Sequence, residues 1–467
     1  MSGGGNGVAG GSTHILMFPW LAFGHISPFA QLARTLVSGD HGVRVTFLTA
    51  AGNVPRVKDM LASSAAVAVV PLQLPRVPGL PEDAASTAEL SAHGAELLKV
   101  AVDGTRPQVA ALLADLRPDA VLFDFAVPWV CAIAAPLGVK ALQFSVFSAI
   151  SGAFLAARRP HDGPRVSAAD FMAAPAGFPP TSPVAGGVPA YQASDFTYVF
   201  TSFGGEPSVH DRIVAGIEAS DGLVVKTCAE MEGPYVDYLS AQFGKPVLLA
   251  GPVVPEPPHG EVDERWSTWL SSFPDGAVVF ASFGSETFLP PAAAAELLLG
   301  LEAAGRPFVA VLNFPKGADA EAELRTRVPA GFEERVKGRG IVHTGWVQQQ
   351  HILRHRSVGC FLNHAGFSSV VEGLVAGCRL VMLPMKGDQY LNAALFAREL
   401  KVGVEVARRD EDGWFGREDV SSAIAAAAAE GGDGEGRKWR EFLMDDAVQE
   451  RFADNLVRDL KKLVTVA

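Results

Sequence analysis

Two polar residues in the N-terminal half stand where predicted strands end. His25 lies in the turn Phe23–Pro28, after a predicted strand at His14–Trp20, and Asp124 closes a predicted strand at Ala120–Asp124. A histidine whose pKa is near neutrality can take the proton of a hydroxyl group, which is a poor nucleophile near neutral pH. A carboxylate on its other ring nitrogen would orient the imidazole and stabilise the imidazolium. Taken singly, each residue also has a structural interpretation, His25 as a helix-start residue and Asp124 as a helix cap.

A second group of polar residues surrounds a glycine-containing turn in the C-terminal half. The turn His364-Ala-Gly-Phe-Ser-Ser369 separates a predicted strand at Gly359–Asn363 from a helix that carries Glu372. Free backbone N–H groups at such a helix start bind phosphate oxygens, and His364 and Ser369 can add side-chain donors. Glu372 lies one turn deeper on the same face of the helix, where its carboxylate can hold a ribose diol.

Two further turns belong to the same predicted site. Ser282-Phe-Gly-Ser285 follows a predicted strand at Val278–Phe283 and could cover the other side of a diphosphate. Asp388-Gln389 follows the predicted strand Leu380–Pro384. Ligands of open α/β sheets bind at such strand ends, and the acceptor oxygens there suit sugar hydroxyls.

The elements that must position these residues alternate along the whole chain. Short apolar runs are followed by longer amphipathic stretches, which is typical of a parallel sheet covered by helices. In the first half the predicted strands are His14–Trp20, Val43–Thr49, Ala66–Pro71, Ala120–Asp124, Lys140–Phe144 and Gly222–Lys226. In the second half they include Val278–Phe283, Phe308–Leu312, Gly340–His343, Gly359–Asn363 and Leu380–Pro384. We therefore predict an α/β fold with two Rossmann-like domains.

A proline-rich segment marks the predicted domain boundary. Four prolines in the ten residues 251–260 forbid a helix and discourage a strand, so this segment is predicted to be a linker. The predicted organisation is a flexible tail at 1–12, an N-terminal Rossmann-like domain at 13–250, the linker, a C-terminal Rossmann-like domain at 261–447, and a final segment at 448–467 whose helix is expected over about Val448–Val464.

Composition limits the partners and the compartment. The net charge is −12 without a Lys/Arg run, which argues against nucleic acid and anionic membranes as partners. The four cysteines lie far apart, which excludes a zinc ribbon and a disulfide framework. Neither a signal peptide nor an apolar 18-residue window is present, so we expect a cytoplasmic protein without membrane insertion. Asp410-Glu-Asp412 has the D-x-D spacing of a metal site, but the flanking arginines and glycine favour a solvated turn, so no metal is expected.

Two irregular segments, Leu74–Asp83 and about 159–200, interrupt the alternation of strands and helices. Long irregular segments are usually lids or binding loops, although a poorly ordered surface loop remains the alternative. Aromatic residues near the predicted cleft suit a flat aromatic guest, and each would equally suit an ordinary core. The acceptor-binding candidates are Trp20, Phe23, Phe125, Phe147, Ser148, Phe196 and Phe200.

One segment, Trp346–Gln389, combines the C-terminal turns with a tryptophan ahead of them. Its marked positions are Trp346-Val-Gln-Gln349, Leu353-Arg-His355, Gly359-Cys-Phe361, His364-Ala-Gly366, Ser369, Glu372, Gly377, Pro384 and Asp388-Gln389. These positions closely resemble the 44-residue donor-binding signature of plant family-1 UDP-glycosyltransferases, and the match has no gap. The order of the whole chain is also similar to that family, from the N-terminal histidine turn to the final helix. The resemblance implies that residues 13–250 bind the acceptor, that residues 261–447 bind the UDP-sugar, and that the helix in 448–467 packs back on the N-terminal domain.

The resemblance implies a GT-B architecture, in which two Rossmann-like domains face a cleft, and inverting, metal-independent transfer from a UDP-sugar. It implies that Trp346 stacks on uracil, that the Val347 backbone reads the base edge, and that Gln349 and Glu372 contact the ribose. Considered alone, Trp346 could be a core aromatic and His364 a core histidine. The candidates for the diphosphate are Ser282, Ser285, His364, Gly366, Ser368 and Ser369, and those for the sugar are Asp388 and Gln389. The resemblance also makes His25 and Asp124 the catalytic pair.

Some positions indicate a branch of the family, and others depart from its pattern. Phe367 and Lys386-Gly387 resemble the branch that decorates flavonoid and anthocyanin glycosides. Ser368 stands where the family usually has asparagine, so a phosphate contact is lost or carried by water. Ala365 and Arg379 are further departures.

We therefore expect a monomeric enzyme that transfers a sugar, glucose by the resemblance at Gln389, to a flavonoid, an anthocyanidin or its glucoside. A terpenoid or other specialised-metabolite acceptor is the first alternative. A non-catalytic UDP-sugar-binding protein and a nucleotide-dependent oxidoreductase are the others. Because no G-x-G-x-x-G motif stands between a strand and a helix, the residues argue against the oxidoreductase.

Overall fold

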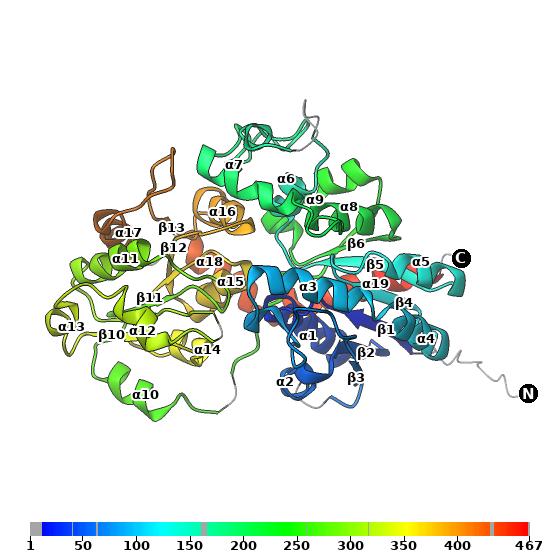
Figure 1. Ribbon diagram of the computed structural model, residues 1–467, viewed down its shortest axis with the longest axis horizontal. Coiled ribbons are helices and arrows are strands. Elements are labelled where there is room, and N and C mark those ends of the chain that lie inside the picture. Colours follow the sequence, from blue (N-terminus) through cyan, green and yellow to red (C-terminus); the bar gives the residue numbers. More distant parts are fainter. Residues whose placement is uncertain are drawn as a thin grey trace, which may run out of the picture.

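The computed structural model describes residues 12–39, 41–61, 64–159, 166–258, 260–315, 317–429 and 434–465. It consists of two lobes, each built on one parallel β-sheet (Figure 1). Buried apolar clusters flank both sheets, so each sheet has a core on either face. The predicted α/β class and the GT-B pair of Rossmann-like halves are thereby confirmed. Residues 1–11 of the predicted tail lie outside the described residues.

The N-terminal lobe holds a seven-stranded sheet with the order β3-β2-β1-β4-β5-β6-β7. Its strands are β1 Thr13–Phe18, β2 Val43–Ala50, β3 Val67–Leu72, β4 Ala120–Phe123, β5 Lys140–Ser145, β6 Gly222–Val225 and β7 Val247–Leu249. The central strands are apolar throughout, as in β4, where all four residues are buried. The order of connection reverses between β1 and β4, and this switch point is where open α/β sheets bind ligands.

The C-terminal lobe repeats this plan with six strands in the order β10-β9-β8-β11-β12-β13. They are β8 Val278–Ser282, β9 Phe308–Val311, β10 Gly340–His343, β11 Val358–Asn363, β12 Arg379–Met382 and β13 Gly403–Glu405. Its switch point lies between β8 and β11. The strands predicted from the sequence match every central strand within one or two residues. The strands β7 and β13, which have three residues each at sheet edges, were not predicted.

The helices pack on the faces of the two sheets. Those of the N-terminal lobe are α1 Phe23–Ser38, α2 Val54–Met60, α3 Ala92–Asp103, α4 Arg106–Leu116, α5 Val130–Ala134, α6 Ala149–Leu155, α7 Ala190–Phe196, α8 Val209–Ala219 and α9 Ala229–Phe243. Those that follow are α10 Glu264–Ser271, α11 Pro291–Ala303, α12 Ala320–Arg325, α13 Phe332–Arg335, α14 Gln349–Leu353, α15 Phe367–Ala376, α16 Asp388–Ala393, α17 Arg417–Ala429, α18 Glu435–Met444 and α19 Asp446–Thr465.

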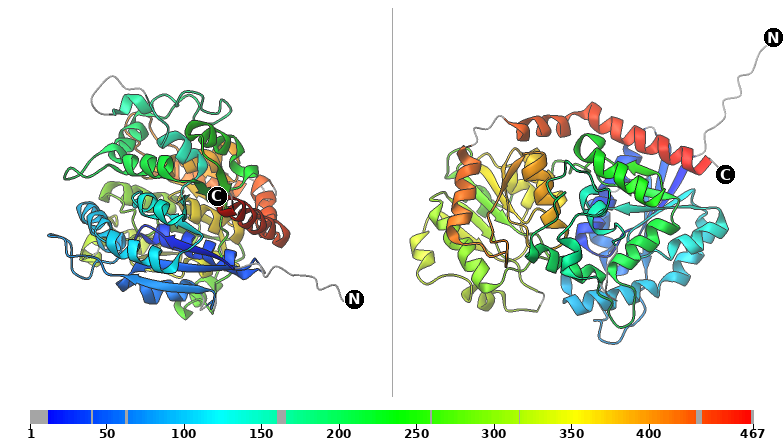
Figure 2. Two further views of the ribbon diagram at one scale, coloured as in Figure 1. Left: turned by 90° about the vertical axis from the view of Figure 1, so that its right-hand side faces the viewer. Right: turned by 90° about the horizontal axis from the view of Figure 1, so that it is seen from above.

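The last helix, α19, returns to the N-terminal lobe. It runs along the side of the molecule from one lobe to the other (Figure 2) and contacts α1 and β7. Leu456, Val457 and Leu460 recur at helical spacing and are buried in the core under the first sheet. Thus the chain joins its lobes twice, once through the segment after β7 and once through this helix.

Candidate functional site

The two N-terminal candidates meet at the switch point of the first sheet. His25 lies in the first turn of α1, and its Nδ1 is 2.7 Å from Asp124 Oδ2. Asp124 directly follows β4 and is held by two backbone groups. The Trp20 N–H donates to its Oδ2 at 3.0 Å, and the Phe125 N–H donates to its Oδ1 at 2.8 Å. The carboxylate accepts the Nδ1 proton of His25, which leaves Nε2 as the basic nitrogen.

The surroundings of His25 increase its basicity. Burial lowers the pKa of His25, but the Asp124 carboxylate, with Glu286 and Asp388, outweighs this and holds the pKa above its ordinary value of 6.5. The His25 side chain is 13% exposed and that of Asp124 is 2% exposed. Such a histidine becomes able to accept a proton as the pH rises through its pKa, and it keeps a small opening toward a ligand.

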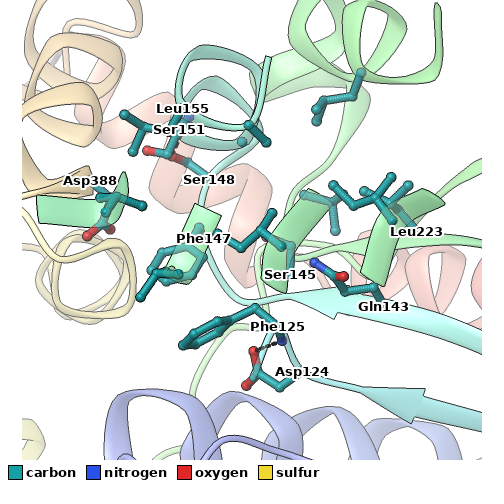
Figure 3. A pocket seen from close by; sticks show the side chains of 18 of the residues that line it. Asp124, Phe125, Gln143, Ser145, Phe147, Ser148, Ser151, Leu155, Leu223 and Asp388 are labelled. Carbon is teal, nitrogen blue, oxygen red and sulfur yellow. Dashed lines mark hydrogen bonds between the residues drawn. The ribbon is translucent and has the colours of Figure 1, made fainter. Parts of the chain in front are cut away.

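An apolar pocket lies beside this pair (Figure 3). The rings of Phe125 and Phe147 lie 5.5 and 5.3 Å from the His25 ring, and both phenylalanines line the pocket. The empty space along this pocket is about 800 Å³, which includes space open to solvent. The polar side chains in its wall are Asp124, Gln143, Ser145, Ser148, Ser151 and Asp388.

Three of the acceptor candidates, Phe125, Phe147 and Ser148, line this pocket, and Trp20 and Phe23 do not. Trp20 is 6% exposed, and its ring lies 6.1 Å from that of Phe125, so it supports the pocket wall from behind. Phe23 lies beneath the Arg56 guanidinium, whose central carbon is 3.5 Å from the ring centroid. Both rings are therefore occupied by protein contacts.

Phe196 and Phe200, from the second irregular segment, also lie outside the pocket lining. Phe196 is fully buried, with its ring 5.7 Å from that of Phe171. Phe200 stacks on His210 at 4.2 Å. Phe171 and Phe196 belong to a large buried cluster that includes residues of both lobes, and Phe200 packs against that cluster. The same segment contributes Tyr198 to the pocket instead.

The predicted phosphate-binding turn lies between β11 and α15, at the switch point of the second sheet. Gly366 is the N-cap residue of α15, and Ala365 adopts a φ of 60° before it. The Asn363 side-chain oxygen stabilises this bend by accepting the Ala365 N–H at 2.8 Å. Within the described chain, Nδ1 of His364 is buried without a hydrogen-bond partner, and burial lowers the pKa of His364 to about 4. The ring is therefore neutral, with a polar atom left for a ligand.

The second predicted turn approaches the first one. A Cβ on Gly284 would lie 3.1 Å from the His364 ring, so this close approach needs a glycine, and its φ of 73° needs one as well. Ser285 next to it is exposed, while Ser368 and Ser369 are half-buried at the start of α15. The fold thus brings the candidate diphosphate ligands of both turns together.

A chain of hydrogen bonds joins the candidates for the ribose. The Ser282 hydroxyl donates to Gln349 Oε1 at 3.0 Å, and the Gln349 amide donates to Glu372 Oε2 at 2.7 Å. Burial raises the pKa of Glu372. Trp346, three residues before Gln349, is 74% exposed, whereas Val347 is buried. An exposed indole of this size is a free surface for stacking on a flat ring.

The candidates for the sugar stand at the start of α16. Asp388 Oδ2 accepts the amide of Asn392 at 3.0 Å, and Asn392 Oδ1 accepts the hydroxyl of Ser148 at 2.6 Å. Asp388 is therefore connected through Asn392 to Ser148 in the wall of the apolar pocket, and burial raises the pKa of Asp388. Gln389 instead uses its side-chain oxygen to accept two backbone N–H groups of its own loop, at 2.9 and 3.1 Å.

Several polar residues between the two lobes were not predicted from the sequence. They are Lys226, Asp195, Glu286 and Asn392. Asp195 accepts the Gly387 N–H at 2.7 Å, and Glu286 accepts the Thr87 hydroxyl at 2.6 Å. Each of these contacts joins one lobe to the other, so spacing along the chain does not encode it. Only Lys226, a lysine at the end of an apolar strand, carried a signal that could have been noticed.

Three general features complete the description of the chain. Among the described residues, no group of three or more His, Cys, Asp and Glu side chains is placed to hold a metal ion. In the D-x-D segment, Asp412 is paired with Arg409. No helix in the described ranges is long and apolar enough to cross a membrane. All four cysteines are free and buried.

Comparison with known proteins agrees with this geometry. A family model described as "UDP-glucoronosyl and UDP-glucosyl transferase" matches residues 263–415. An anthocyanidin-3-O-glucoside rhamnosyltransferase of Petunia hybrida is 50% identical, with 97% of each chain covered. An anthocyanidin 3-O-glucoside 2''-O-glucosyltransferase of Ipomoea nil is 38% identical over 97% of this chain and 98% of its own length.

Solved structures show the same fold. The Arabidopsis thaliana enzyme UGT89C1, crystallised with UDP-L-rhamnose, superposes with a TM-score of 0.74 at 24% identity, covering 96% of this chain and 99% of that one. Two facing Rossmann-like lobes, the identity to plant relatives over nearly the full length and the matching family model agree with one another. The chain belongs to the plant UDP-glycosyltransferase family, and it is a UDP-dependent glycosyltransferase.

Proposed function

We propose that this enzyme transfers a sugar from a UDP-sugar to a hydroxyl group of a flavonoid glycoside, with inversion at the anomeric carbon and without a metal ion. One observation carries the proposal. The His25–Asp124 pair, the apolar pocket and the half-buried carboxylate of Asp388 lie around one space, since Asp124 and Asp388 both line that pocket. A base, an acceptor site and a sugar-binding group thus converge.

In the proposed reaction, His25 Nε2 takes the proton of the acceptor hydroxyl. The oxygen attacks the anomeric carbon from the face opposite the diphosphate, and the bond to the UDP oxygen breaks with its electron pair leaving on UDP. Asp124 holds the imidazole and stabilises the imidazolium, which later returns its proton to solvent. A single displacement of this kind inverts the anomeric carbon.

The UDP-binding half of the proposal rests on the turns at the second switch point. The N-terminus of α15, His364, Ser369 and Ser285 would meet the charge of the diphosphate, and they would do so without a metal ion. Trp346 would stack on the uracil and Glu372 would hold the ribose. The exposed indole and the unpartnered Nδ1 of His364 support this assignment.

The acceptor proposal combines the wall of the pocket with the relatives. Phe125 and Phe147 suit a flat aromatic ring system, while the hydroxyl and amide groups around them suit an attached sugar. The Petunia and Ipomoea relatives are both named for an anthocyanidin 3-O-glucoside, but one is a rhamnosyltransferase and the other a glucosyltransferase. We therefore propose a flavonoid 3-O-glycoside as the acceptor class. Glucose is the donor sugar expected from Gln389, and the experiment below compares UDP-glucose with UDP-rhamnose as donors. A monomer in the cytoplasm is the further proposal, supported by the free cysteines and the net charge of −12.

The test is a matrix of donors and acceptors. Purified enzyme is incubated with UDP-glucose, UDP-rhamnose or UDP-xylose, in EDTA, against flavonoid and anthocyanidin aglycones, their 3-O-glucosides and terpenoid alcohols, and the products are identified by mass spectrometry. We expect one added sugar on the glucosides. Products on aglycones or terpenoids alone would overturn the acceptor class, loss of activity in EDTA would overturn the metal-free mechanism, and no turnover with any pair would overturn catalysis in favour of UDP-sugar binding alone.

A further inference from the structure

A buried lysine reaches from the N-terminal lobe to the start of α15. Lys226 directly follows β6 and is 1% exposed. Its Nζ donates to the hydroxyl oxygen of Ser368 at 2.6 Å and lies 5.0 Å from the centroid of the Phe367 ring. A side chain of the acceptor-binding lobe therefore contacts the first turn of the helix that we propose to bind the diphosphate.

The charged residues around Lys226 show where it lies relative to the proposed donor site. The two carboxylates that act on it are Glu372 and Asp388, which we propose to hold the ribose and the sugar. No carboxylate of the described residues lies within ion-pair distance of Nζ, and burial lowers the pKa of Lys226 to about 7. The diphosphate of a UDP-sugar joins its ribose to its sugar. Lys226 thus lies where the ligand would place its negative charge.

Burial of a positive charge is unfavourable unless an anion or hydrogen-bond acceptors compensate it, so the position of Lys226 beside the first turn of α15 suits a negatively charged ligand. Because Nζ donates to Ser368, the oxygen of Ser368 serves as the acceptor and its own O–H is free to donate elsewhere. Ser368 also stands where the family usually has a longer asparagine. The lysine behind this serine supplies charge and orientation that the shorter side chain lacks.

We propose that Lys226 is a donor-positioning residue: through Ser368 it presents a hydrogen bond and a positive charge to the diphosphate of the UDP-sugar. This inference rests on the proposed function, in which the turn before α15 binds the diphosphate. The charge comes from the acceptor-binding lobe, so Lys226 also couples donor binding to the contact between the lobes.

A purely structural role for Lys226 makes a different prediction. If the lysine only held the lobes together, its loss would weaken the binding of every uridine nucleotide by the same factor. If it faces the diphosphate, its loss must weaken the binding of UDP more than that of UMP, because UMP lacks the second phosphate and its charge. The ratio of the two dissociation constants therefore separates the two roles.

The experiment measures UDP and UMP binding by isothermal titration calorimetry at low salt. Lys226→Met removes the charge and nearly keeps the length of the side chain. Lys99→Met is the matched control, because Lys99 is another buried lysine, 6% exposed and paired with Glu96 on α3. We expect Lys226→Met to weaken UDP by about tenfold or more, the effect of losing a hydrogen bond to a charged group, and UMP by about threefold or less. Lys99→Met should leave both affinities as in the wild type.

Ser368→Ala keeps Lys226 and provides a second variant should Lys226→Met fold poorly. It removes the proposed connection, so we expect the same selective loss of UDP affinity, and adding Lys226→Met to it should cost little more. An unchanged ratio of UDP to UMP affinity in Lys226→Met or in Ser368→Ala would overturn the inference. Failure of the wild-type enzyme to bind either nucleotide would instead overturn the proposed donor site.

Discussion

The two halves of the site differ in how complete they are without ligand. At the first switch point, Asp124 accepts hydrogen bonds from two backbone groups and from His25. At the second, Trp346 is 74% exposed and Nδ1 of His364 has no partner in the described part of the chain. The protein itself supplies the hydrogen bonds of the proposed base, whereas the proposed donor turn has polar and aromatic groups that are free to contact a ligand.

This difference indicates how the two halves work. A base that is oriented in advance needs no reorganisation when the acceptor arrives. Groups that are left unsatisfied gain most when UDP binds, so they contribute mainly to donor affinity. Substitutions at the first switch point should therefore change turnover, and substitutions at the second should change the dissociation constant of UDP.

The largest effect is expected from His25→Ala. Loss of the base should lower kcat by about 10²–10⁴-fold, the usual contribution of a positioned general base. The dissociation constant of UDP, measured by calorimetry, should stay within about twofold of the wild-type value because the donor turn is untouched. Full turnover by this variant would show that another group takes the proton.

Asp124→Asn tests the orientation and the charge of the base. His25 must be unprotonated to act, so kcat/KM should rise with pH through its pKa, which Asp124 holds above 6.5. Without the carboxylate the pKa of His25 falls, and the acidic limb of the pH profile should move to lower pH. The maximal rate should also fall, because the ring is no longer held in the productive tautomer. If the acidic limb of the pH profile does not move, the group that titrates there is not His25.

Trp346→Ala probes the unfilled half of the site. Loss of stacking on the uracil should weaken UDP by about 5- to 150-fold, equivalent to about 1–3 kcal/mol, and leave kcat at saturating donor nearly unchanged. Trp414→Ala is the control, since Trp414 is another exposed tryptophan, 38% exposed, outside the proposed site. Equal UDP affinities in the two variants would remove Trp346 from the donor site.

Asn392→Ala tests the link between the halves. The amide holds Asp388 and contacts Ser148 across the cleft, so its loss should lower kcat/KM by about 2- to 12-fold, the cost of one hydrogen bond. Ser148→Ala combined with Asn392→Ala should cost less than the sum of the single effects, because both break the same link. If the effects of the two substitutions on kcat/KM are strictly additive, the hydrogen bond between Ser148 and Asn392 does not contribute to catalysis.

The smallest effect is expected from Phe200→Leu. Phe200 packs on His210 outside the pocket lining, so kcat and KM should stay within about twofold of the wild type, with only the melting temperature lowered. Phe147→Leu, at a ring that contacts His25 and the pocket, should instead raise the KM for the acceptor. Equal kinetic effects of the two substitutions would require a different acceptor pocket.

Strands in the middle of the sheets could be predicted from the sequence better than edge strands and aromatic contacts. The central strands could be predicted because they are buried on both faces and therefore read as apolar runs, as in β4. The edge strands β7 and β13 were missed because three residues form no recognisable pattern. Phe196 and Phe200 were expected to bind the acceptor because the sequence shows that the segment is rich in aromatic residues. It does not show which of these rings face a ligand and which pack into the protein.

The sequence alone determined the α/β fold and the strand ends that carry His25, Asp124 and the proposed donor turn, and its resemblance to the donor-binding signature implied the reaction class. The fold and the strand ends depend on patterns within single chain segments, which the order of residues states directly. The tertiary structure decided which groups from one lobe meet those of the other, such as Lys226 on Ser368 and Ser148 on Asn392. Such contacts join residues 142 and 244 positions apart, and they depend on how the two lobes pack against each other.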